Sequence, residues 1–204
     1  MKVLGFDPGM KRMGISVIER NELGNIELID FGYFSNERNP KDPYNKFLNE
    51  AIQSLADAMP KIIYDYAPNI IVSETVPVGR LGNNTELVVA AITVVKVIAY
   101  QFGIPWIDMG ANKIKLLSTD NGTASKAQVK NAVFNLFPQV KEEHKKERER
   151  QKAEGIAPSK ATGIPQDVFD GIAVALAGLL FEEEKRKNEQ DNIRPEIEGT
   201  ARSL

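Results

Sequence analysis

The chain opens with MKVLGFDPG (residues 1–9), and this stretch decides the fold. Its apolar run, Val3–Phe6, predicts a short buried strand, and the turn residues after Asp7 end that strand. The run IIVSE (residues 70–74) repeats the arrangement, because a strand-forming segment ends in Glu74. Open α/β sheets bind their ligands at the carboxyl ends of strands. We therefore expect Asp7 and Glu74 to face one cleft.

Strand and helix patterns alternate around these two runs. Residues 14–18 and 26–34 have strand character and predict an antiparallel meander with the first strand. Apolar residues then recur at helical spacing over residues 43–66, where Pro60 should kink or divide the helix. A further strand is predicted in GIPWIDMG, and helices are predicted over residues 85–102, 111–117, 125–137 and 166–180. This order predicts an α/β fold with a mixed five-stranded sheet, three strands antiparallel and then two parallel, flanked by helices.

Composition predicts one folded domain with a charged end. A length of 204 residues suits one large domain, and 42% hydrophobic with 26% charged residues is ordinary for a globular protein. We assign residues 1–182 to the domain and residues 183–204, which lack core material, to a charged flexible tail. Residues 141–165 are a charged insertion. Its first part holds six basic and five acidic residues, which predicts a solvated helix or mobile arm, with a DNA-contacting arm as the alternative.

Several function classes are excluded by composition. There is no Cys and only one His, so thiolate zinc sites, cysteine nucleophiles and multi-histidine centres are ruled out. A metal would need carboxylate ligands, which suit magnesium or manganese. Lys96 and Gln101 interrupt the longest apolar stretch, and no apolar leader opens the chain, so a cytoplasmic protein without membrane contact is expected. A net charge of -2 argues against non-specific coating of nucleic acid.

Asp167 and Asp170 add two more acids near the start of a predicted apolar helix. They are three residues apart and so share one helical face. Asp7 also suits a turn and Asp167 also suits a helix cap, so each has a purely structural alternative. Asp170 lies inside an apolar run, where an unpaired acid is unfavourable unless a cation compensates it. Clustered carboxylates repel one another, and two divalent ions about 4 Å apart would relieve this and support phosphodiester hydrolysis.

Four segments of the chain, in this order, resemble the RuvC Holliday-junction resolvases of the RNase H-like superfamily. They are GFDPGMKRMGISVIE (residues 5–19), IIVSETV (70–76), ANKIKLLSTDNGTASKAQVKNAVFNLF (111–137) and DVFDGIAVALAGL (167–179). The resemblance implies an RNase H-like fold and an enzyme that nicks opposing strands of a four-way junction, using Mg²⁺ or Mn²⁺ with two ions per site. It implies a homodimer, with the helix after Glu74 at the dimer face. The implied metal-binding catalytic residues are Asp7, Glu74, Asp167 and Asp170.

Basic residues flank the predicted cleft. Lys115 and Lys126 stand where the resemblance places contacts to DNA phosphates. The others, each of which taken singly is also an ordinary surface charge, are Lys11, Arg12, Arg80, Lys113 and Lys130.

The chain departs from the RuvC pattern in two places. Pro77 stands where bacterial RuvC has an aromatic residue that enters the junction centre, and Arg80 nearby could substitute through its charge. The insertion 141–165 is longer than in bacterial enzymes. Other branched DNA therefore remains open as substrate.

Three other functions are compatible with parts of this pattern. An actin-like ATPase also opens with Asp-x-Gly on a strand, but it needs two such domains and a second phosphate loop. An RNase H-like nuclease acting on RNA or on RNA–DNA hybrid would use similar acids, although the basic residues at Lys115 and Lys126 favour the resolvase. A non-catalytic junction-binding protein would not require all four acids.

Overall fold

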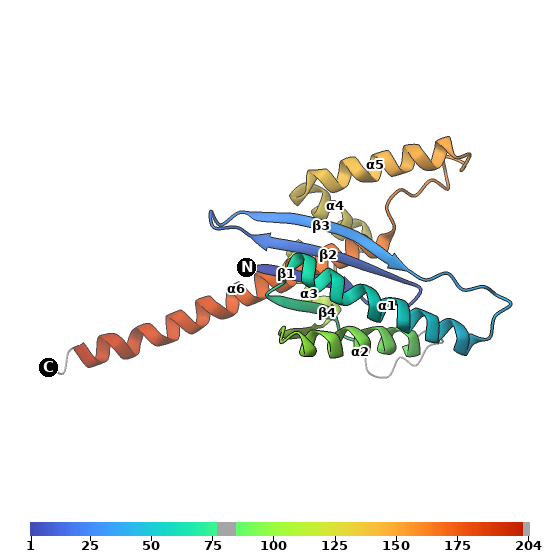
Figure 1. Cartoon of the computed structure of the whole chain (residues 1–204). Coiled ribbons are helices and arrows are strands. Elements are labelled where there is room, and N and C mark those ends of the chain that lie inside the picture. The colour runs from blue at the N-terminus through green and yellow to red at the C-terminus, as the bar shows by residue number, and fades with distance from the viewer. Residues whose placement is uncertain (77–84, 202–204) are drawn as a thin grey trace.

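The computed structural model describes residues 1–76 and 85–201, with side chains described as far as Glu189. Its five-stranded sheet has the order β3-β2-β1-β4-β5 (Figure 1). The first three strands pair antiparallel, while β4 and β5 continue the sheet parallel to β1. The predicted mixed sheet is confirmed. The strands are β1 Lys2–Asp7, β2 Arg12–Arg20, β3 Ile26–Ser35, β4 Ile70–Glu74 and β5 Trp106–Met109.

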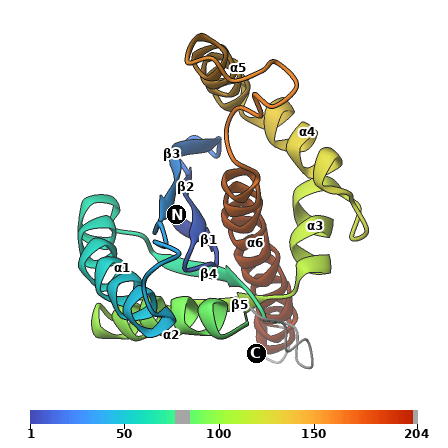
Figure 2. The same ribbon diagram turned by 90° about the vertical axis from the view of Figure 1, so that its right-hand side faces the viewer.

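Helices cover both faces of the sheet, so the molecule has three layers (Figure 2). One face carries α1 and α2, which pack against each other, and the other carries α6, with α3 and α4 beside it. The helices are α1 Tyr44–Tyr66, α2 Thr85–Gln101, α3 Ala111–Thr119, α4 Lys126–Leu136, α5 Pro138–Ala153 and α6 Gln166–Ala201.

Each face of the sheet has its own hydrophobic core. Strand β1 supplies side chains to both, because successive side chains of a strand point to opposite faces. Val3 packs with α6 on one face, whereas Leu4 and Phe6 pack with α1 and α2 on the other. All three side chains are fully buried or nearly so. Such a central strand reads as a continuous apolar run rather than an alternating one, because both faces are covered.

Glycines let α6 approach the sheet at van der Waals distance. A Cβ at Gly5 would lie 2.3 Å from the Ala175 nitrogen, and one at Gly14 would lie 1.7 Å from the Asp167 carbonyl oxygen. Ser16 on β2 then donates a hydrogen bond of 2.9 Å to the Gly171 carbonyl. The start of α6 is therefore fixed directly on β2.

Pro60 does not divide α1, contrary to one of the two outcomes predicted for it. The helix runs unbroken from Tyr44 to Tyr66. Its buried stripe continues across the proline, since Leu55, Met59 and Ile63 all pack in the same core. Tertiary packing on both sides of the proline outweighs the local loss of one backbone hydrogen bond.

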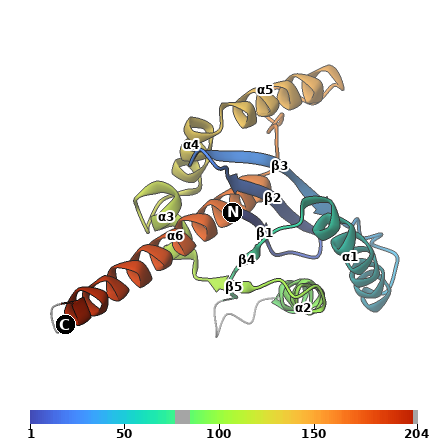
Figure 3. The same ribbon diagram turned by 60° about the vertical axis from the view of Figure 1, so that its left-hand side comes forward.

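The two charged segments are largely helical, except that residues 154–165 of the insertion form turns and a loop. Ser125 caps α4 through a capping box with Gln128, and α5 follows and extends into the charged insertion. Helix α6 crosses the sheet and continues beyond it to Ala201 (Figure 3). The division of the chain at residue 182 stays a prediction. In residues 1–76 and 85–201, no helix combines the length and apolar character that a bilayer span requires.

His144, the one histidine of the chain, joins α5 to the body of the protein. It is 8% exposed and lies edge-on to Phe169 and tilted against Phe134, with ring centroids 5.6 and 5.4 Å away. Burial, and then the charges of Lys130 and Arg148, lower the pKa of the imidazole to about 4. The folded protein therefore holds this ring neutral.

We expect the free energy of unfolding to fall by roughly 1 kcal/mol between pH 7 and pH 5 because of His144. Its pKa is about 4 in the folded protein and near 6.5 in the unfolded chain, so between these values only the unfolded chain takes up the proton. The stabilisation is complete above pH 6.5 and is lost as the pH falls toward 4. Urea unfolding of the wild type and of His144→Phe at pH 7 and pH 5 measures this change in the free energy of unfolding. Equal pH dependence in both proteins would contradict it.

Candidate active site

Two parallel strands bring the first two acids together. Asp7 ends β1 and Glu74 ends β4, and the strands pair in a register that sets Phe6 beside Ser73. The two carboxylates consequently leave the sheet at the same edge. Both side chains are half-buried. The expectation that Asp7 and Glu74 share one cleft is met by this register.

Helix α6 brings the other two acids to the same edge. Gly14 pairs with Asp7 across β1 and β2, and the Asp167 carbonyl stands over Gly14. The first turn of α6 therefore begins beside Asp7. Asp170, one turn further, reaches the same pocket. A missing side chain at Gly14 is the local reason for this proximity.

The acids line a pocket of about 290 Å³. Its polar lining consists of Asp7, Glu74, Asp170, Lys115 and Lys126, and its apolar lining consists of Ala111, Ile114, Val129, Ala173 and Val174. Asp167 stands outside this lining, because its carboxylate faces the Arg12 guanidinium at 3.6 Å. Three of the predicted acids, Asp7, Glu74 and Asp170, thus line one pocket, and Asp167 lies at its margin.

Burial and mutual repulsion of the carboxylates raise the pKa values of Asp7 and Glu74. The pKa of Asp7 is raised to about 7, first by burial and then by the charges of Asp170, Glu74 and Asp167. The pKa of Glu74 is raised by burial and by Asp170, and Lys115 and Lys126 oppose that rise. Acids in a depression whose pKa values are pushed up by one another are typical of sites that bind cations.

The described carboxylates do not form a preorganised metal-coordination site. Across the described ranges 1–76 and 85–201, no three His, Cys, Asp or Glu side chains surround a common point closely enough to hold an ion. Asp170 accepts from Gln166 at 2.9 Å and faces the Lys126 ammonium at 3.5 Å, and Asp167 faces Arg12. Protein cations thus balance two of the four acids. The donor set nevertheless fits a hard divalent cation, which takes carboxylate oxygens and would offset the repulsion at Asp7.

The predicted basic residues divide into two groups. Lys115 on α3 and Lys126 on α4 line the acidic pocket, and Arg12 borders it beside Asp167 while its guanidinium lies 5.5 Å from the Tyr33 ring. These three cations therefore border the acids of the pocket.

Three other basic candidates that the structure describes do not line the pocket. Lys113 pairs with Glu184 at 3.3 Å on the outer side of α3, and Lys130 lies one turn beyond Lys126 against His144. Lys11 is exposed at the start of β2. The candidates Arg80 and Pro77 lie outside the described residues.

Sequence reasoning missed Gln166, which orients the Asp170 carboxylate from one turn earlier. The only signal was the four-residue spacing between the two, which allows contact on any helix. Such a spacing occurs too often by chance to single out one glutamine.

Known proteins resemble this chain over most of its length. The family profile described as "Crossover junction endodeoxyribonuclease RuvC" matches residues 3–157. A protein of that name from Prochlorococcus marinus is 25% identical over 180 residues, which cover 88% of this chain and 99% of the relative. Another, from Cupriavidus taiwanensis, is 29% identical over 138 residues, covering 67% and 72%.

Solved structures agree on the fold. The Thermus thermophilus RuvC structure superposes with a TM-score of 0.67 at 20% identity, covering 91% of this chain and 97% of the other. The same protein in complex with a Holliday junction substrate gives a TM-score of 0.66 at 18% identity, covering 90% and 96%. The predicted RNase H-like fold is confirmed. Since the family profile spans more than half of the sequence, the chain belongs to the RuvC family of crossover junction endodeoxyribonucleases.

Proposed function

We propose that this protein is a structure-selective DNA endonuclease that resolves Holliday junctions by metal-dependent hydrolysis of phosphodiester bonds. One observation carries the proposal. In a chain of the RuvC family, Asp7, Glu74 and Asp170 line a single pocket rimmed by Lys115 and Lys126. Relatives that match this chain are named crossover junction endodeoxyribonucleases, and one structural relative was solved with a Holliday junction.

Nucleases of this family depend on metal ions. We assign the ions here as Mg²⁺ or Mn²⁺, two per site, held by Asp7, Glu74, Asp167 and Asp170. Held by these four carboxylates, the ions would supply an activated water molecule and positive charge at the leaving oxygen of the phosphodiester. The protein itself supplies the negative cavity, which is half-buried and rigid because each acid stands on a strand end or on the first turns of α6.

The basic rim has a separate role in binding the substrate. Lys115 and Lys126 are positioned to hold the phosphate to be cleaved against the acids, and Arg12 offers a further contact at the margin. These cations bind the backbone and not the bases, which suits recognition of DNA by shape. Other branched DNA substrates are compatible with such contacts.

A homodimer would supply two sites for paired nicks, and we assign its interface to α2. This helix exposes Val89, Val97 and Tyr100, the last of which is 63% exposed, and Phe102 directly after it is also exposed. An isologous contact of two such faces would bury them around a twofold axis. We place the protein's action in the cytoplasm, as expected from the sequence.

Cleavage of synthetic substrates tests the proposal. The purified protein is incubated with a four-way junction, the matching duplex and an RNA–DNA hybrid, in Mg²⁺, Mn²⁺ or EDTA, beside Glu74→Gln. Paired nicks in the junction that need metal and Glu74 are expected. Equal cleavage of the hybrid would instead support an RNase H-like activity on RNA. ATP turnover without cleavage would support the actin-like alternative.

We expect Lys126→Ala to lower the single-turnover cleavage rate about 10²-fold, because its ammonium lines the acidic pocket and lies 3.5 Å from the Asp170 carboxylate. Binding of the junction in EDTA should weaken far less, since one phosphate contact of several is lost. Lys61→Ala is the matched control, an exposed lysine on α1 paired with Asp65. A cleavage rate equal to that of this control would contradict the assigned role.

A further inference from the structure

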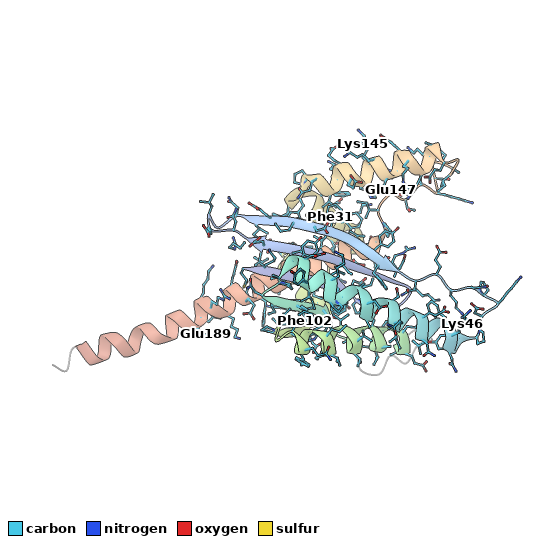
Figure 4. All side chains as sticks on the ribbon, in the orientation of Figure 1. Phe31, Lys46, Phe102, Lys145, Glu147 and Glu189 are labelled. Carbon is cyan, nitrogen blue, oxygen red and sulfur yellow. The ribbon has the colours of Figure 1, made fainter. Side chains whose placement is uncertain are left out.

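Helix α5 carries its charges in two separate stripes. One stripe is salt-bridged: Arg150 lies 2.7 Å from Glu147 and 2.8 Å from Glu154, and Lys146 lies 3.6 Å from Glu143. The other stripe is basic, with members spaced at i, i+4, i+7 and i+11 along one face. It consists of Lys141, Lys145, Arg148 and Lys152. Figure 4 shows Lys145 and Glu147 on opposite sides of the helix.

The basic stripe has no carboxylate partners. Within the part of the chain that the structure describes, no Asp or Glu oxygen lies within 4.0 Å of its four cations, although Glu142 and Glu149 are on the same helix. Arg148 donates to the Ala161 carbonyl at 3.0 Å and so ties α5 to the following loop. The three lysines are exposed. A helix with acids within reach leaves this row of cations uncompensated.

Together with α4, the stripe lines a second pocket of about 490 Å³. Five cations and two acids contribute to its lining, together with two rings: Lys130, Lys141, Lys145, Arg148, Lys152, Glu142, Glu149, Phe134 and His144. The pocket is therefore locally positive in a protein whose net charge is -2. This sign is opposite to that of the acidic pocket.

At the inner end of this pocket, no oxygen of the described residues accepts a hydrogen bond from Lys130. Its Nζ lies 2.9 Å from Nε2 of His144, while Nδ1 of the same ring accepts from the Ile164 amide at 3.1 Å. A neutral imidazole that accepts at Nδ1 carries its hydrogen on Nε2 and cannot also accept from an ammonium there. Lys130 lies over the rings of Phe134 and Phe169, which offer it only cation–π contacts. An external anion would provide the missing acceptor.

Helix α4 connects the two pockets. Lys126 and Lys130 are four residues apart and face the same side, about 6 Å apart along the axis. Lys126 contacts Asp170 in the acidic pocket, and Lys130 lines the basic pocket. Figure 2 shows α5 beyond α4, on the same side of the molecule as the start of α6. A strand whose phosphate lies at Lys126 thus has a continuous path toward α5.

We propose that the basic pocket and stripe form a second phosphate-binding site, which holds the backbone of a junction arm away from the cleavage centre. The inference rests on the proposed function and extends it to the insertion. The stripe runs over residues 141–152, about 16 Å of helix, which along a duplex axis matches about five phosphates of one strand. A single small anion would leave most of this row unused, so the length favours a DNA backbone.

Equilibrium binding of a four-way junction in EDTA at several salt concentrations tests this site. The test variant is Lys141→Ala/Lys145→Ala, and the matched control is Lys146→Ala/Arg150→Ala, which removes the same charge from the salt-bridged stripe. We expect the test variant to bind about tenfold more weakly at low salt, with a log–log salt slope smaller by about 1.8, or 0.9 per lost contact. The control should stay within about twofold of wild type.

Further readouts separate the possible failures. Single-turnover cleavage at saturating protein should be unchanged in the test variant, because neither lysine touches the acidic pocket. Equal affinity and equal slope in the two double variants would overturn the second site and leave the proposed function intact. Inorganic phosphate at matched ionic strength that erased the difference between the variants would also overturn it, in favour of a small-anion site. A wild-type protein that neither bound nor cut branched DNA would remove the proposed function itself.

Discussion

Asp7→Asn is expected to abolish metal-dependent junction cleavage and, at the same time, to raise the thermal unfolding midpoint of the metal-free protein. The carboxylate is crowded by Asp170, Glu74 and Asp167, and its pKa stands near 7. Asparagine keeps the shape and removes the repelling charge. It also removes one of the carboxylates to which we assign the metal ions, so the loss of cleavage should be at least about 10³-fold.

The stabilisation should depend on pH in a defined direction. Because the folded pKa of Asp7 lies above that of the unfolded chain, wild type loses stability as the pH rises from about 4 to about 7, and the loss is then constant. The substitution by asparagine removes this dependence. We expect the variant to gain roughly 1–3 kcal/mol over wild type at pH 8 in EDTA and much less at pH 5.

Asp57→Asn is the matched control for this variant. Asp57 is exposed on α1 and accepts one hydrogen bond from Gln53, far from the acidic pocket. Its substitution should leave both the unfolding midpoint and cleavage close to wild type. An Asp7→Asn protein that cleaved at the wild-type rate, or that melted no higher than wild type in EDTA at pH 8, would contradict the electrostatic account of the site.

The acidic centre was predictable because its signals are local. Asp7 and Glu74 each end an apolar run that could only be a buried strand, and parallel strands deliver such ends to one edge. Asp170 was marked by its apolar surroundings at the start of α6. Asp167 was ambiguous between cap and ligand, and its contact with Arg12 keeps it at the margin of the pocket.

The second pocket could not be predicted, because its character depends on pairing between elements. The charge run in residues 141–154 predicted a solvated helix or mobile arm, with a DNA-contacting arm as the alternative, and a count of its charges shows near balance. The numbers of basic and acidic residues are nearly equal, but four of the basic side chains gather on one face of α5. Which cations of α5 remain uncompensated depends on how the helix is rotated against α4, and that rotation is fixed by the burial of Val140 and His144. The unbroken helix at Pro60 likewise depends on tertiary packing.

Among the glycines that the structure describes, Gly14 should be the one where an added methyl group does the most damage. The added Cβ would stand 1.7 Å from the Asp167 carbonyl oxygen, a backbone atom that cannot rotate away. The start of α6 would have to shift off β2. Overpacking against backbone costs about 3 kcal/mol or more, and a displacement near 1 Å of Asp167 and Asp170 relative to Asp7 should lower cleavage about 10²-fold.

Gly32→Ala provides the comparison, since Gly32 lies on the neighbouring strand β3 and a Cβ there meets no atom within 4 Å. This control should unfold within about 0.5 kcal/mol of wild type and cleave normally. Urea unfolding and single-turnover cleavage, measured on both variants, test whether the close contact between β2 and α6 matters for stability and activity. If Gly14→Ala kept wild-type stability and rate, the close contact between β2 and α6 would not be what positions the acids. If Gly14→Ala lost both stability and cleavage while Gly32→Ala kept them, the absence of one methyl group on β2 would be what holds the start of α6 beside Asp7.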